Sequence, residues 1–116
     1  MISASLAVAC ATILMAWTTP EERGKELFVR RCSGCHATDS NKEGPRLRGV
    51  YGRKAGAVPD FGYSEALKKS SIRWDDASLE RWLTDPDALV RDTDMVFHVE
   101  DGEERKALIA YLKTLK

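Results

Sequence analysis

The hydrophobic positions along the chain divide it into segments of different character. An apolar run from Ile2 to Trp17 contains no charged side chain, and charges begin abruptly at Glu21. Farther along, short stretches carry apolar residues at helical spacing. Residues 37–62 are instead rich in Gly, Pro and polar residues, without strand alternation or a long helical period. The pattern predicts a leader, a few short helices and a long ordered loop.

The first helix has a clear start signal. Thr19 is a good N-cap, followed by Pro20 at the first helical position and Glu22 at the third. Apolar or small residues then recur on one face, namely Gly24, Leu27 and Phe28. We therefore expect a helix that begins immediately after Thr19.

Three further helices are expected in the second half of the chain. Residues 64–69 can form a short helix, and Asp75 or Asp76 caps a longer one that must end before Pro86. The sequence DGEE at 101–104 is another capping signal and opens the terminal helix. The apolar stripes of the last two helices are Leu79, Trp82 and Leu83, and Leu108, Tyr111, Leu112 and Leu115. Such short helices supply few core residues, so something other than side chains is expected to fill the middle.

The N-terminal run, residues 1–19, is interpreted as an export leader preceding a domain at 20–116. It is short for a membrane-spanning helix, which needs about 20 residues, and fits a secretory apolar region better. Cleavage near residues 16–19 would suit its length. An uncleaved short anchor and a lipid-modified Cys10 remain alternatives, although the preferred interpretation of Cys10 is a small apolar residue of the run. Each interpretation exports the C-terminal domain.

Composition excludes several classes of protein. A chain of 116 residues has room for one small domain, which is too little for a nucleotide-binding fold with a second substrate domain. The 18 Lys and Arg balance 18 Asp and Glu, so a strongly basic nucleic-acid-binding protein is not expected. With three cysteines, a multi-disulfide scaffold is also excluded.

The sequence CSGCH at 32–36 carries the chemistry. In a C-x-x-C-H motif, the thiols of Cys32 and Cys35 can attach to the two vinyl groups on one edge of a porphyrin. The adjacent His36 imidazole then reaches the iron. The motif therefore predicts one covalently attached haem c.

Three other interpretations of the motif are weaker. A thioredoxin-like pair belongs near a βαβ pattern, and no strand signal accompanies this one. A zinc site needs four ligands, and the domain offers Cys32, Cys35, His36 and His98, of which two are consecutive. A simple disulfide is the third possibility. The motif and its context favour covalent haem over all three.

Met95 is the best candidate for the second axial ligand of the iron. Haem iron is ligated in proteins by His, Met, Cys or Tyr. Met1 and Met15 lie in the leader, which leaves Met95 as the methionine of the domain, in a loop after Pro86. His98, three residues farther on, is the rival ligand, although a solvated surface histidine is the simpler interpretation.

From about Gly24 to Lys116, the chain resembles the class I c-type cytochromes, close to mitochondrial-type cytochrome c and its bacterial small relatives. The matching motifs occur in the family's order and cover essentially the whole exported domain. They are G-x-x-x-F at 24–28, CSGCH at 32–36, GPRLRGVYGR at 44–53, FGYS at 61–64, Trp74, L-x-x-W-L at 79–83, T-D-M-V-F at 93–97 and LIAYL at 108–112. The resemblance implies an all-α small cytochrome c fold, with short helices and long loops around one haem.

The resemblance also implies roles for individual residues. His36 would be the proximal ligand, with its other ring N–H donated to the Pro45 carbonyl, and Met95 the distal ligand. The residues implied near the haem propionates are Arg53, Tyr63 and Trp74. Phe97 would border the haem, and Trp82 would pack in the core at a haem-contact position where the family often carries Tyr. Gly24 and Phe28 would pack against Leu108 and Tyr111 of the last helix.

The charge pattern departs from the mitochondrial members of the family. They carry lysines around the haem edge, including one beside the ligand methionine, where this chain has Asp94. Residues 85–104 contain eight acidic side chains and the single cation Arg91, whereas residues 23–54 contain nine basic and three acidic ones. The domain is therefore expected to be dipolar despite its zero net charge, which puts any transfer of mitochondrial docking partners in doubt. An ordinary solvated surface explains the same charges equally well.

The residues and the resemblance together predict a one-electron carrier and not an enzyme. Two alternatives stay open: a five-coordinate haem enzyme or gas sensor, if Met95 does not ligate, and a cytochrome subunit fixed to one redox enzyme. We expect a monomer that exchanges electrons with membrane-bound or soluble redox proteins and binds no nucleic acid. Because the leader lacks Arg, it does not resemble a mitochondrial transit peptide, and a bacterial periplasm is the expected location, with or without anchoring by the leader.

Overall fold

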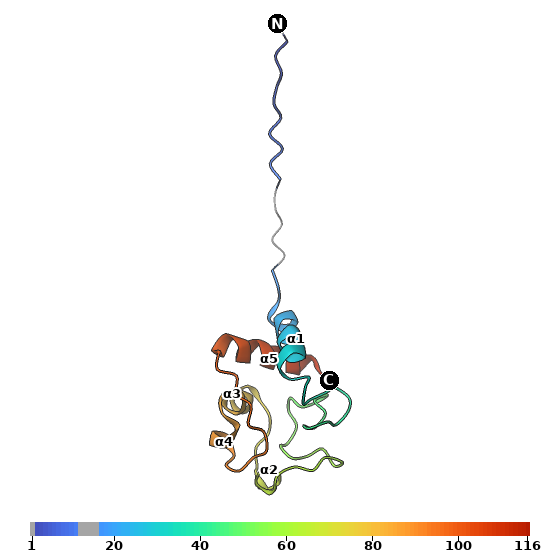
Figure 1. The fold of residues 1–116 in the computed structure, drawn as a ribbon, viewed down its shortest axis with the longest axis vertical. Coiled ribbons are helices and arrows are strands. Elements are labelled where there is room, and N and C mark those ends of the chain that lie inside the picture. Colours follow the sequence, from blue (N-terminus) through green and yellow to red (C-terminus); the bar gives the residue numbers. More distant parts are fainter. Residues whose placement is uncertain (1, 12–16) are drawn as a thin grey trace.

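The computed structural model of the protein describes residues 2–11 and 17–116, and it is helical (Figure 1). The helices of the described residues are α1 (Pro20–Arg31), α2 (Glu65–Lys69), α3 (Asp76–Thr84), α4 (Pro86–Leu89) and α5 (Gly102–Thr114). Within the described residues there is no β-strand, and Lys54 and Arg73 form an isolated antiparallel bridge. The predicted all-α class and the four predicted helices are confirmed.

Side-chain caps start the three longer helices where the sequence placed them. The hydroxyl oxygen of Thr19 accepts the Glu22 backbone N–H at 3.2 Å, and the Glu22 carboxylate accepts the Thr19 N–H in return. Asp75, rather than Asp76, caps α3 and forms the same reciprocal pair with Ser78. The carboxylate of Asp101 accepts the backbone N–H groups of the first turn of α5. Each cap satisfies helix N–H groups that have no partner within the helix.

Helix α4 occupies a segment that was expected to be loop. α3 does end before Pro86, as expected, but Pro86 then becomes the first residue of a new short helix. The carboxylate of Asp85 accepts the Ala88 N–H and caps this turn. Proline fits here because the first residue of a helix needs no N–H donor. The expectation of a loop directly after Pro86 is therefore wrong for residues 86–89, because this proline both follows the end of α3 and starts α4.

The two ends of the domain meet where α1 crosses α5 (Figure 1). A Cβ atom on Gly24 would lie 2.0 Å from the Ala107 carbonyl oxygen, so the close approach of the helices requires glycine at this position. Phe28 stacks against Tyr111 with ring centroids 5.4 Å apart, and Leu108 is buried beside them. The expected packing is confirmed, with Ala107 as an additional contact.

The long loop between α1 and α2 is tied to the rest of the domain by backbone hydrogen bonds. Gly49 N–H donates to the Leu115 carbonyl at 2.5 Å, and Ala55 N–H donates to the Ile72 carbonyl at 2.8 Å. Val50 and Ala55 are buried in the core as a result. The loop is thus an ordered wall of the domain, as the sequence predicted.

The described part of the N-terminal run, residues 2–11, is extended and exposed, and it projects away from the helices (Figure 1). Residues 1 and 12–16 lie outside the described part, and with them a portion of the predicted leader and of its cleavage region. Among the described residues, no helix is both long enough and apolar enough to cross a membrane.

Candidate haem site

A cavity of about 570 Å³ lies between the helices and the loops. This volume falls within the range of about 300–1,000 Å³ typical of cofactor sites. Apolar side chains from helices and loops form its walls, including Phe28, Leu47, Val50, Leu67, Leu79, Leu83, Leu108 and Leu112. All of the predicted site residues also line it, namely Cys32, Cys35, His36, Pro45, Arg53, Tyr63, Trp74, Trp82, Met95 and Phe97.

The imidazole of His36 is oriented by one hydrogen bond. Its Nδ1 lies 2.9 Å from the Pro45 carbonyl oxygen, and because a carbonyl can only accept, Nδ1 must carry the proton. The neutral ring therefore keeps a lone pair on Nε2. Burial lowers the pKa of His36, which the Pro45 hydrogen bond partly opposes and the nearby cations Arg53 and Lys42 reinforce. The side chain is thus held in the tautomer that a metal ligand requires.

Gly44 lets the loop approach the His36 ring. A Cβ atom at this position would lie 2.2 Å from Cε1 of the imidazole, well inside any allowed contact. The Gly44 N–H also donates to the Cys35 carbonyl at 2.8 Å, which ties the loop to the end of the motif. The Gly-Pro pair therefore holds the imidazole from two sides, sterically at Gly44 and by hydrogen bonding at Pro45.

The two thiols of the motif follow directly on α1. Cys32 is the C-cap of the helix and is partly buried, whereas Cys35 is exposed at the edge of the cavity. Burial raises the pKa of the Cys32 thiol to about 11, against the opposing effect of Arg31. Both cysteines are free thiols, which does not support a disulfide. In the described residues, no cluster of three or more His, Cys, Asp or Glu is placed to hold a metal ion.

Met95 lies on the cavity wall and is held by a neighbour from α3. The indole Nε1–H of Trp82 donates to the Met95 sulfur at 3.2 Å. Trp82 also packs edge-on against Trp74 at 5.1 Å between centroids. The expectation of core packing for Trp82 is therefore confirmed but incomplete, because the indole N–H also contacts the candidate ligand. The partners are thirteen positions apart in the sequence, and no local pattern in the sequence signals such a bond.

Arg53 and Tyr63 line the cavity with their polar atoms bonded to backbone. The Arg53 guanidinium donates to the carbonyls of Arg46 at 3.0 Å and Arg48 at 3.3 Å. Burial lowers the pKa of Arg53 from its usual value. The Tyr63 hydroxyl accepts the Val58 N–H at 3.1 Å, and this leaves its own proton available to a further acceptor.

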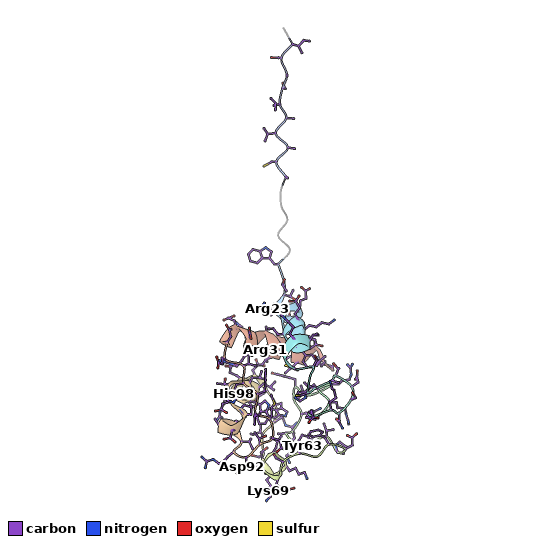
Figure 2. All side chains as sticks on the ribbon, in the orientation of Figure 1. Arg23, Arg31, Tyr63, Lys69, Asp92 and His98 are labelled. Carbon is purple, nitrogen blue, oxygen red and sulfur yellow. The ribbon has the colours of Figure 1, made fainter. Side chains whose placement is uncertain are left out.

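Arg31 joins three parts of the site, a role that the sequence analysis did not foresee. It is the last residue of α1 and is labelled in Figure 2. Its guanidinium lies over the Phe97 ring, 5.4 Å from the centroid, and forms an ion pair with Glu104 in the first turn of α5. This contact bridges the attachment motif, the loop that carries Met95 and the last helix.

His98, the rival ligand, does not line the cavity. Its side chain is about half exposed, and Nε2 lies 3.9 Å from an Asp85 carboxylate oxygen. Figure 2 shows His98 at the side of the domain formed by α3 and α4. The arrangement favours Met95 over His98 as the residue able to reach a bound group.

A neutral imidazole nitrogen, a thioether sulfur and two thiols around one apolar cavity define a protein that holds a haem covalently. The cytochrome c family model matches residues 21–116. The chain belongs to the cytochrome c family.

Relatives of known sequence and structure span most of the chain. It is 45% identical over 98 residues to cytochrome c of Euglena viridis, covering 82% of this chain and 96% of that protein. It is 42% identical over 88 residues to cytochrome c2 iso-2 of Magnetospirillum molischianum, covering 73% and 91%. The structure of cytochrome cH from Methylobacterium extorquens superposes with a TM-score of 0.77 at 43% identity, covering 81% of this chain and 97% of that one.

Family membership defines the general activity. The protein carries a covalently attached c-type haem and acts as a carrier of single electrons between redox partners. The prediction of haem c and of electron transfer is confirmed. The fold class, with short helices and long loops, is confirmed as well.

Proposed function

We propose that His36 and Met95 are the two axial ligands of the haem iron, and that Cys32 and Cys35 hold the porphyrin through thioethers. The observation that carries this proposal is the Nδ1 hydrogen bond of His36 to the Pro45 carbonyl, because it leaves Nε2 with a lone pair beside the cavity. Met95 lines the same cavity and is the second axial ligand of this proposal, and the apolar walls surround the porphyrin. The bound haem supplies one-electron chemistry by cycling between Fe(II) and Fe(III).

The surrounding residues favour the reduced state. A thioether ligand such as Met95 stabilises Fe(II) and raises the reduction potential. The apolar walls act in the same direction, because the reduced site carries less net charge. With both axial positions filled by protein, no iron position is open to a substrate, so we propose a carrier and not an enzyme. Arg53, Tyr63 and Trp74 are the residues proposed to contact the propionates.

The N-terminal run supports a proposal about location. We assign residues 1–19 to an export leader and residues 20–116 to the haem domain, which begins at the Thr19 cap of α1. Export of a C-x-x-C-H protein by a leader without Arg suggests a bacterial periplasm. We propose that the domain works there as a monomer, without binding nucleic acid, on redox proteins that are membrane-bound or soluble. N-terminal sequencing of the mature protein tests the leader assignment.

The test of the ligand assignment is the optical spectrum of the haem-loaded protein in both oxidation states. The ferric protein should show the far-red absorption band of sulfur-ligated iron, and the reduced protein should not respond to carbon monoxide. A missing sulfur band together with ready binding of the gas would establish an open iron site. The five-coordinate alternatives, an enzyme or a sensor, would then replace the carrier.

A further inference from the structure

Two exposed apolar side chains lie at the mouth of the cavity. Val96 is 83% exposed and Phe97 is 38% exposed, and both line the cavity beside Met95. In residues 20–116, the other exposed large apolar side chains are Val29 and Tyr51, and neither lines it. Adjacent exposed apolar residues are typical of the centre of a protein–protein contact.

Carboxylates without partners flank this apolar pair in the sequence. Asp92 and Asp94 precede it, and Glu100 and Glu103 follow it; all four are exposed. Among the described residues, no hydrogen bond or ion pair involves any of these four carboxylate groups. The neighbouring acids already have partners, since Asp101 accepts backbone N–H groups at the start of α5 and Glu104 pairs with Arg31. We call Val96, Phe97 and the four free carboxylates the acidic ligand-loop face.

Two cations line the cavity, Arg31 and Arg53. Arg31 is paired with Glu104 and covers the Phe97 ring. Arg53 is held by the backbone carbonyls of Arg46 and Arg48 in the long loop. The segment that carries Val96 and Phe97 is itself negative, because Arg91 is the one cation against eight acidic side chains between residues 85 and 104.

We propose that the acidic ligand-loop face is the docking surface for a redox protein whose own contact surface carries Lys and Arg around an apolar centre. The proposal rests on the proposed function, because it assumes that electrons leave at the edge of the haem site. The carboxylates steer the partner toward the site, and the apolar pair makes the final contact. Such an interface is small and weak, which suits rapid exchange of a carrier.

The first test maps the surface directly. The ferrous, isotope-labelled protein is titrated in an NMR experiment with zinc-substituted mitochondrial cytochrome c, a basic and redox-inert probe. Shifts confined to residues 92–104 support the proposal, and the same probe with its lysines acetylated should shift nothing. Shifts centred elsewhere, or equal shifts with the acetylated probe, overturn it. This measurement needs no variant, so it remains decisive if a variant fails to fold.

The second test measures electron transfer with charged reagents. One electron leaves the ferrous haem, which becomes ferric, and reduces tris(phenanthroline)cobalt(III) to cobalt(II), or hexacyanoferrate(III) to hexacyanoferrate(II). In the Asp94→Asn/Glu103→Gln variant, the rate with the cobalt cation should fall about three- to tenfold at low salt, and the rate with the cyanide anion should rise. Both effects should fade as the salt concentration increases.

The matched control removes two carboxylates of α1 that do not line the cavity. Glu21→Gln/Glu26→Gln changes α1, and Figure 2 places Arg23, near the start of α1, at the opposite end of the domain from Asp92. This variant should leave both rates unchanged. If the control lowers the cobalt rate as much as Asp94→Asn/Glu103→Gln, net charge alone explains the effect and the proposal fails. If every variant keeps the far-red sulfur band, the ligand assignment stands even where the docking proposal fails.

Discussion

At the scale of single residues, Trp82 has an electrostatic effect as well as a packing role, because its indole N–H donates to the Met95 sulfur. The positive end of the indole N–H dipole lies 3.2 Å from the sulfur. If Met95 ligates the iron as proposed, this dipole withdraws electron density that the sulfur would otherwise donate to the metal. Since ferric iron depends more on that donation than ferrous iron does, the bond favours the reduced state. Trp82 is thereby a positioning residue for Met95 as well as part of the core.

Replacing Trp82 by Phe should lower the reduction potential. Phe keeps an aromatic ring but removes the N–H, and a hydrogen bond of about 0.5–1.5 kcal/mol corresponds to about 20–60 mV for one electron. Equilibrium redox titration measures the change. Tyr51→Phe is the control, since it also keeps an aromatic ring and removes one side-chain hydrogen bond, to Asp76, at a residue that does not line the cavity. An unchanged potential in Trp82→Phe would show that the bond has no effect on the iron.

Substitution by Ala should alter the haem site strongly at Met95 and hardly at all at His98. Met95→Ala should remove the sulfur band, open the iron to carbon monoxide and lower the potential, because the thioether that stabilises Fe(II) is lost. His98→Ala should change little, since that side chain lies outside the cavity. Optical spectra of both variants decide the matter. Loss of low-spin character in His98→Ala alone would overturn the ligand assignment.

At the scale of helices, the domain depends on the crossing of α1 and α5. Gly24 has no space for a methyl group, because the obstructing atoms belong to the Ala107 backbone and to Tyr111 near its Cα. Neither can rotate away as the tip of a long side chain would. The separation of the two helices is therefore fixed by one residue.

Gly24→Ala should destabilise the protein despite the higher helix propensity of alanine. The propensity gain is about 1 kcal/mol, whereas forcing two helices apart costs typically 1–3 kcal/mol and more where backbone is struck. We expect a net loss of about 2 kcal/mol in the free energy of unfolding, measured by denaturant titration. Gly34→Ala is the matched control, because a Cβ at that position has no neighbour within 4 Å. Equal stability of the two variants would contradict the assigned role.

Capping chemistry explains which elements could be predicted from the sequence. Thr19, Asp75 and Asp101 signal their helices through contacts three residues away or closer, which a linear pattern contains. Helix α4 was not predicted because Pro86 both stops one helix and starts the next. The bonds of Trp82 to Met95 and of Arg31 to Glu104 were not predicted for another reason. Their partners meet only after folding, and residue type alone does not select them.

At the scale of the whole molecule, the cavity is too large for the domain to tolerate if left unfilled. Packed protein interiors contain few voids larger than a water molecule, whereas this cavity holds about 570 Å³ between mostly apolar side chains. Without a bound group, those side chains would face water or empty space, which a small domain with a small core can hardly offset. The bound haem is therefore a structural part of the core, in agreement with the scarcity of apolar residues noted in the sequence.

A chain unable to attach haem should not hold this fold. The Cys32→Ala/Cys35→Ala variant is expected to lose most of its helical circular dichroism at 25 °C and to bind hydrophobic dyes. Cys10→Ala is the control, since Cys10 lies outside the domain and is exposed, and it should keep the wild-type spectrum. A cooperative thermal transition in the double variant would show that side chains alone fill the core.

The crossing of α1 and α5 also imposes an order on how the protein is made. The helix that leads into the attachment motif lies at the start of the domain, and the helix that packs against it is the last element of the chain. If the chain is exported as proposed, with its N-terminal part crossing the membrane first, Cys32 and Cys35 emerge while α5 is still on the other side. We expect the attachment machinery to meet an open, unpacked segment, and the arrival of the final thirteen-residue helix to close the domain around a haem that is already bonded.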